Sequence, residues 1–228
     1  MKKQQPISEA TRAAILNATW ALMAEKGRLD VGQSEIAEAA GVSRQTVYLA
    51  FGDRAGLLMA MARNRDTQSD HVMRFGKISY AQAVMPADFV EYLDIWLDYL
   101  QLLYPVAIQL DAASLTDRDV ASAFDDRMKG ALLAGFKRVL KLLAKGGHLR
   151  PGCEPDCAAE MIWSLTHPTA WRQLVVELGW SADEFRRSRL DIIGATVLKP
   201  GRLQRARRAS APRRKAGRRF GSRRKADE

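Results

Sequence analysis

Residues 32–51 read GQSEIAEAAGVSRQTVYLAF, and this stretch predicts two short helices joined by a tight turn. We expect the first helix over Gln33 to Ala40 and the second over Arg44 to about Ala50. Gly41 ends the first helix, because glycine tolerates the positive φ that a sharp turn needs. Ser43 is a favourable N-cap for the second helix.

Three residues predict how these two helices pack. Ala37 is a small residue on the first helix, Gly41 stands in the turn, and Val47 is a branched apolar residue on the second helix. Together they let two short helices pack at a steep angle, as in a helix-turn-helix unit. The alternative is an ordinary helical hairpin in a core. Two features argue against it: the second helix is too short to serve packing alone, and its outward face is polar.

This polar face suits the major groove of DNA, where the side chains of a helix reach base edges. An arginine can bond guanine bidentately, a glutamine suits adenine, and a threonine suits a phosphate or a thymine methyl group. Tyr48 is expected to bond a phosphate through its hydroxyl group. The candidate DNA contacts are Gln33, Ser34, Ser43, Arg44, Gln45, Thr46, Tyr48 and Arg54, and Lys2 and Lys3 are candidates for the adjacent groove. For each residue, the alternative is a solvated surface side chain.

The remaining sequence predicts an all-α protein. Apolar residues at helical spacing indicate a first helix that Ser8 or Thr11 caps and that ends near Lys26, and a fourth helix from near Asp53 as far as Phe75. Further helices are expected over residues 86–104, 105–115, 117–145, 156–178 with a kink at His167-Pro168, and 181–198. We therefore expect an N-terminal DNA-binding domain over residues 9–69, a helical body over 70–198 and a disordered basic tail over 199–228.

The net positive charge of the chain comes from this tail. The formal net charge is +10, yet residues 199–228 hold thirteen Lys or Arg against two acids, a local charge of +11. Residues 1–198 consequently sum to −1. The case for DNA binding must therefore come from the helix-turn-helix and not from the overall charge.

Composition excludes several classes of protein. The chain has no apolar run of the roughly 20 residues that span a bilayer, and its N-terminus lacks the apolar core of a secretory signal. These features predict a cytoplasmic protein with no membrane contact. Cys153 and Cys157 stand in a loop with His148 nearby, too few ligands for zinc, so we expect two free thiols, with a redox switch as the alternative. Without a nucleophile motif or a phosphate-binding loop, we expect neither an enzyme nor a cofactor or metal.

The helix-turn-helix and its flanks resemble the DNA-binding domain of the TetR family of transcriptional regulators. The resemblance covers about residues 9–69 and rests on Thr11-Arg12, Ile15-Leu16, Ala18, Leu22-Met23, Gly27, Ile36-Ala37, Ala39 to Ser43, Thr46, Tyr48, Phe51 and Leu57-Leu58. This chain departs from the family at Val31-Gly32-Gln33, where a Ser or Thr often precedes the second helix, and this predicts a weaker N-cap. Arg54 stands where the family often has Lys and keeps the charge.

The resemblance implies a ligand-responsive repressor that binds a palindromic operator as a homodimer. It implies that the helices over residues 156–178 and 181–198 form the dimer interface, and that the body holds a small hydrophobic or aromatic effector. Candidate pocket residues are Trp96, Tyr99, Tyr104, Phe124, Met128, Trp163, His167 and Trp171, although aromatic residues at helical spacing also form ordinary cores. The alternative function is a non-specific, architectural DNA-binding protein in which the basic tail dominates.

Overall fold

The computed structural model describes residues 7–26, 31–202 and 205, and this part of the chain folds into helices. An isolated antiparallel bridge joins Leu149 to Leu198. The helical elements, of which η1 and η2 are π-helical, are α1 (Glu9–Lys26), α2 (Gln33–Ala39), α3 (Arg44–Phe51), α4 (Arg54–Thr67), α5 (His71–Ser79), α6 (Pro86–Ser114), α7 (Arg118–Asp125), η1 (Asp126–Leu133), α8 (Ala134–Lys145), α9 (Pro155–Leu165), α10 (Pro168–Trp171), η2 (Arg172–Glu177) and α11 (Ala182–Val197).

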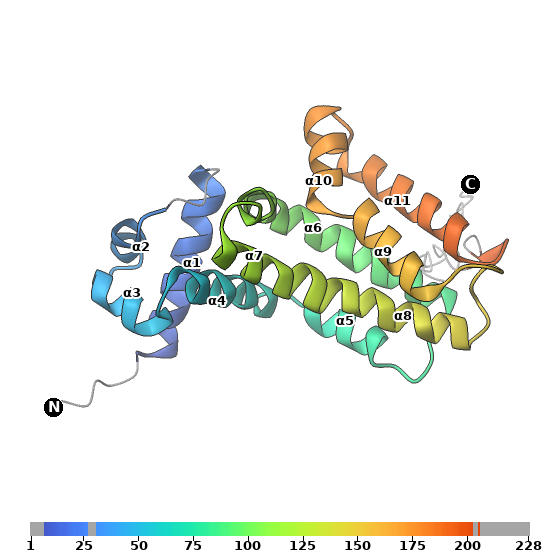
Figure 1. The fold of residues 1–228 in the computed structure, drawn as a ribbon, viewed down its shortest axis with the longest axis horizontal. Coiled ribbons are helices and arrows are strands. Elements are labelled where there is room, and N and C mark those ends of the chain that lie inside the picture. Colours follow the sequence, from blue (N-terminus) through green and yellow to red (C-terminus); the bar gives the residue numbers. More distant parts are fainter. Residues whose placement is uncertain (1–6, 27–30, 203–204, 206–228) are drawn as a thin grey trace, which may run out of the picture.

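The molecule is elongated, with α1, α2 and α3 at one end and the helical body at the other (Figure 1). Helix α4 belongs to both parts, because it packs against α1 and α3 on one side and against α7 on the other. The segment α7–η1–α8 runs as one long helical rod beside α6 (Figure 1). Helix α9 packs against α8, and α10 and α11 pack against α6. The small unit and the body are thus joined through α4 and through the packing of α1 on α6.

Polar side chains at the helix starts explain where several of these elements begin. The Ser43 hydroxyl accepts a hydrogen bond from the Thr46 amide at the start of α3, and Asp53 accepts one from Gly56 at the start of α4. Asp117 caps α7, and Ser181 forms a reciprocal capping box with Glu184 at the start of α11. Each cap satisfies an amide that has no partner inside the helix.

The predicted all-α fold is confirmed, but two predictions about the helices are wrong. The helix expected to continue to Phe75 ends at Thr67, and α5 begins separately at His71. The two helices expected on either side of Pro105 are one helix, α6, because buried Val106 and Leu110 continue its apolar face beyond the proline.

The expected kink at His167-Pro168 is confirmed as a break between α9 and α10. Lys2, Lys3, Gly27 and most of the basic tail lie outside the described residues. The start of the tail is described: the Lys199 amide donates to the His148 carbonyl, which attaches this segment to the end of the body. Among the described residues, the helices lack an apolar stretch of the length that a membrane span requires.

Candidate nucleic-acid interface and body cavity

Helices α2 and α3 are joined by the predicted turn at Gly41. Gly41 adopts φ +66°, and the Val42 amide donates to the Ala37 carbonyl at 2.9 Å, which closes the turn. Ala37 and Val47 are both buried at the contact between the helices. The α2–α3 unit is therefore held by the small residue, the turn glycine and the branched residue on which the prediction rested.

The outward face of α3 carries the predicted contact residues at the end of the molecule. Arg44, Gln45 and Ser43 are exposed, and Tyr48 exposes 60% of its surface. Ser34 on α2 is also exposed, whereas Gln33 and Thr46 are half-buried. The Thr46 hydroxyl lies 2.8 Å from that of Ser43 and forms a hydrogen bond with it. A phosphate that contacted either hydroxyl would therefore compete with this hydrogen bond at the N-cap of α3.

Arg54 has a partner within the protein. Its guanidinium lies 2.6 Å from the Asp117 carboxylate at the start of α7, and thus links α4 to the body. Arg12 braces α3 from the other side: it donates to the Ala50 carbonyl at 3.2 Å and stacks over the Phe51 ring. These contacts hold α3 in a fixed position relative to α1 and α4.

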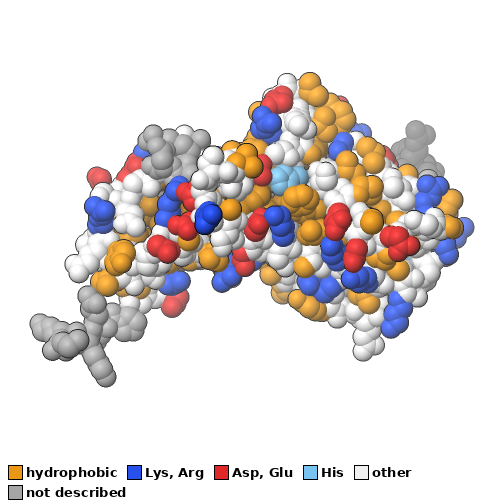
Figure 2. Space-filling model, viewed as in Figure 1, with side chains coloured by type: hydrophobic (Ala, Val, Ile, Leu, Met, Phe, Trp, Pro, Cys, Tyr) orange, Lys and Arg blue, Asp and Glu red, His pale blue; other side chains and the backbone are white. Residues whose placement is uncertain are grey.

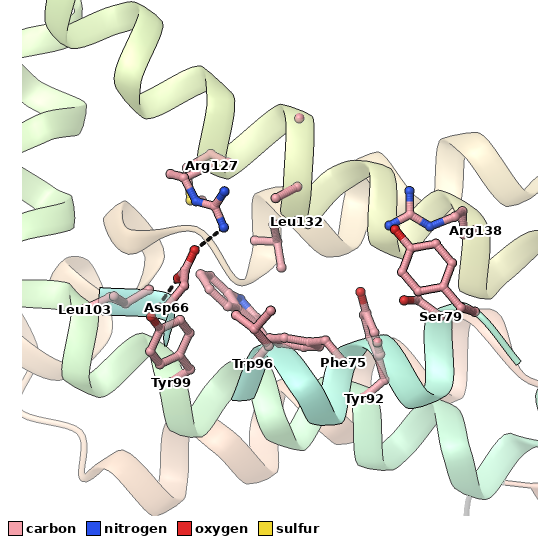
Figure 3. A pocket seen from close by; sticks show the side chains of 16 residues that line it. Asp66, Phe75, Ser79, Tyr92, Trp96, Tyr99, Leu103, Arg127, Leu132 and Arg138 are labelled. Atoms are coloured by element: carbon pink, nitrogen blue, oxygen red, sulfur yellow. Dashed lines mark hydrogen bonds and ion pairs between the residues drawn. The ribbon is translucent and has the colours of Figure 1, made fainter. Parts of the chain in front are cut away.

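The body encloses a cavity of about 340 Å³ between α4, α5, α6, η1 and α8 (Figure 3). This volume is within the range of small-molecule sites. The cavity has apolar side chains along its length and charged groups at both ends. It is lined by Asp66, Val72, Phe75, Gly76, Ser79, Tyr80, Tyr92, Trp96, Tyr99, Leu103, Arg127, Met128, Gly130, Ala131, Leu132 and Arg138.

Of the predicted pocket residues, Trp96, Tyr99 and Met128 line this cavity. The other five are not among its lining residues and form aromatic contacts elsewhere in the body. The His167 ring makes edge contacts with Trp163 and Phe124, and the Trp171 ring contacts Tyr104. The indole of Trp163 also donates to the Met128 carbonyl at 3.1 Å, so this cluster supports one wall of the cavity from behind.

The sequence prediction missed most of the cavity wall, although α6 carried a readable signal. Tyr92, Trp96, Tyr99 and Leu103 follow one another at intervals of four, three and four residues, which places them on one face of a helix. Tyr104, which was predicted instead of Leu103, lies one residue off this face. Asp66 and Arg127 gave no such signal, because they come together from positions 61 residues apart.

One end of the cavity is an ion-pair cluster that includes α4. The Asp66 carboxylate pairs with Arg127 and accepts a hydrogen bond from the Tyr99 hydroxyl at 2.7 Å. Burial raises the pKa of Asp66, and the Arg127 charge opposes that shift. Next to it, Asp126 lies 3.0 Å from Arg63, and these Arg contacts lower the pKa of Asp126. Helix α4 therefore contributes Arg63 and Asp66 to ion pairs with η1.

The two cysteines lie away from this cavity. Cys153 and Cys157 are free thiols, and burial raises the pKa of Cys153, which disfavours the reactive thiolate. Within the described ranges, no group of three or more His, Cys, Asp or Glu side chains is placed to hold a metal ion.

Comparison with known proteins places this architecture among regulators of transcription. Residues 15–61 match the family described as bacterial regulatory proteins, tetR family. The HTH-type transcriptional repressor LfrR of Mycolicibacterium smegmatis is 29% identical over 159 residues, which cover 69% of this chain and 76% of that protein.

Two solved structures share the fold at low identity. A putative transcriptional regulator from Saccharomonospora viridis in complex with choline superposes with a TM-score of 0.68 at 21% identity, over 85% of this chain and 100% of that one. The SmeT–triclosan complex superposes with a TM-score of 0.67 at 20% identity, over 85% of this chain and 94% of that one.

Proposed function

Because the chain belongs to the TetR family of transcriptional regulators, we propose that it is a repressor whose α3 reads a palindromic operator and whose cavity binds a controlling small molecule. The observation that carries the proposal is α3 itself, a capped helix that leaves Arg44, Gln45 and Tyr48 exposed at one end of the molecule. These groups match the donors and acceptors of base edges and phosphates.

A dimer follows from the length of this helix. One helix of eight residues reads only a few base pairs, and two copies related by a dyad read a longer palindrome. The side of the body that carries α10, η2 and α11 exposes apolar side chains that a second copy would bury, among them Val176, Leu178 and Ile192. Figure 2 shows apolar side chains over this part of the surface. We propose that this face is the homodimer interface.

The cavity supports control by a ligand. It lies against α4, the helix that also packs on the DNA-binding unit, and Asp66 of α4 is part of its wall. Similar proteins of this fold have been solved with choline and with triclosan. A ligand that favours one position of α4 would change the separation of the two α3 helices, and DNA would favour the other position.

The test is selection of bound sequences from a random DNA pool, with a chain that ends at Arg202 so that the segment attached to His148 is kept. We expect a two-fold symmetric consensus. Arg44→Ala should cost about 1–3 kcal/mol of operator binding and relax the preference at one base pair of each half-site. Arg74→Ala, a change of the same charge on α5, is the control and should leave binding unchanged.

Comparison with the full-length chain distinguishes a specific repressor from the alternative, a non-specific architectural DNA-binding protein. Eleven of the tail's Lys and Arg residues lie beyond Arg202. If the tail adds phosphate contacts, the full chain will show a steeper dependence of affinity on salt with the same consensus. Absence of a consensus together with length-dependent coating of DNA would contradict a specific repressor, and a monomer mass by light scattering would contradict the dimer.

A further inference from the structure

The two ends of the cavity differ in whether their charged side chains form ion pairs. At one end, Asp66 and Arg127 face each other, and at the other end lie Arg138, Ser79 and the Tyr92 hydroxyl (Figure 3). Trp96 and Phe75 lie between these ends (Figure 3). The cavity therefore has two polar ends and an apolar middle.

The charges of the first end cancel. Asp66 and Asp126 pair with Arg127 and Arg63, so two carboxylates face two guanidinium groups. The Tyr99 hydroxyl fills a further acceptor position of Asp66. A charged ligand gains little here, because it would have to displace a partner that is already present.

Arg138 at the second end has no carboxylate within 4.0 Å among the residues that the structure describes. Its guanidinium lies over the Tyr80 ring, 4.9 Å from the centroid, and its Nε is buried without a hydrogen-bond acceptor. A buried donor of this kind costs free energy until it finds an acceptor. The positive charge is therefore available to whatever occupies the cavity.

A planar carboxylate is the complement of such a group, because a guanidinium offers it two parallel N–H donors. Resting on the proposal that this cavity binds the effector, we infer that the effector is an organic carboxylate: its anionic group binds Arg138, and its aromatic or aliphatic body lies against Phe75 and Trp96. The Tyr92 hydroxyl, at the same end of the cavity as Arg138, is a further donor for the carboxylate.

The test is calorimetric titration of the full chain without DNA, so its result does not depend on operator binding. The probes are two carboxylates and their uncharged primary amides, naphthylacetate with naphthylacetamide and decanoate with decanamide, and choline as a cation. We expect each carboxylate to bind about tenfold or more tightly than its amide, as a charge-assisted hydrogen bond provides, and choline to bind more weakly than either carboxylate.

Matched variants test whether Arg138 is the source of the preference for carboxylates over amides. Arg138→Gln should reduce the ratio between carboxylate and amide to near one, and Arg138→Lys, which keeps the charge and the packing of the stem, should leave an intermediate ratio. Lys145→Gln is the control, since it removes the same charge from an exposed position on the same helix, α8. It should keep the ratio of the native chain.

Several outcomes would overturn the inference. These are equal affinity for acid and amide in the native chain, tighter binding of choline, an unchanged ratio in Arg138→Gln, or no binding of any probe. Failure of the repressor proposal would look different, because the ligand-free chain would then select no DNA consensus while carboxylate binding at Arg138 persisted.

Discussion

Gly32 occupies the N-cap of α2 with extended backbone, φ −70° and ψ 145°, and no side chain caps the helix. This confirms the weak N-cap predicted from Val31-Gly32-Gln33. An N-cap Ser or Asp accepts a hydrogen bond from the amide of N2 or N3 in this conformation. The position has room for one, because a Cβ at Gly32 would meet no other atom within 4 Å.

We therefore predict that Gly32→Ser stabilises the α2–α3 unit by a few tenths to about 1 kcal/mol. Hydrogen exchange of the α2 amides is the suitable measurement, because it reports local opening without assuming that the whole chain unfolds in one step. Gly41→Ala is the opposing control: φ is +66° there, so any side chain is strained and exchange should accelerate. Unchanged protection in Gly32→Ser would show that the cap is not limiting for α2.

Among the helices, the break between α9 and α10 is set by the His167-Pro168 pair. His167 precedes Pro168 and caps α10, since its Nδ1 accepts from the Thr169 amide. That role requires an unprotonated Nδ1. Burial lowers the pKa of His167, although Asp111, 3.8 Å from Nε2, opposes the shift. The side chain predicted as a ligand contact is thus a helix cap inside an aromatic cluster.

The sign of the resulting pH effect follows from the lowered pKa. The unfolded chain takes up this proton near the ordinary histidine pKa of about 6.5, whereas the folded chain takes it up only at lower pH. Stability should therefore fall as the pH drops from about 7 to about 5. The lowered pKa values of His71 and His148 act in the same direction.

His167→Asn should make this loss of stability shallower, because asparagine keeps a capping oxygen for α10 but does not titrate. Urea denaturation at the two pH values measures the difference. The control is His148→Asn, which removes a histidine of the same shift direction outside the cluster and leaves the contribution of His167 in place. An equal pH slope in His167→Asn and the native chain would contradict the assignment.

The predictability of these elements depended on whether the signal was local. The turn at Gly41, the cap at Ser43 and the break at His167-Pro168 were predictable, because each is set by residues that are neighbours in the chain. The separation of α4 from α5 could also have been predicted, since three of the four residues at 67–70, Thr67, Ser69 and Asp70, are turn-forming. The continuation of α6 through Pro105 could not have been predicted from neighbouring residues. Proline removes one backbone hydrogen bond from the helix, and packing against residues distant in the sequence outweighs that loss.

At the scale of the whole molecule, α4 packs on the DNA-binding unit and is tied to the body by a small number of ion pairs. Arg54 pairs with Asp117, Arg63 with Asp126, and Asp66 with Arg127. The first two are largely exposed, and such pairs contribute about 1 kcal/mol or less. Asp66 is more buried and is also bonded to Tyr99, so losing its charge should affect the position of α4 most.

These differences predict which contact transmits ligand binding. At saturating ligand, Asp66→Asn should leave operator affinity nearly independent of the ligand, whereas Arg63→Gln should reduce the ligand effect by no more than about fivefold. The ligand effect is measured as the ratio of operator affinities without and with ligand. Calorimetry on each variant then shows that the ligand still binds in the cavity. Glu25→Gln, an exposed change of the same charge as Asp66→Asn on α1, is the control.

The coupling must also be reciprocal, because operator DNA has to change ligand affinity by the same factor as ligand changes operator affinity. Measuring both factors for the native chain and for Asp66→Asn thus tests the assignment twice. If Asp66→Asn retained the full ligand effect in both directions, the signal would have to reach α3 by a route other than Asp66. The contacts that α4 makes with α1 and α3 would then be the next ones to change.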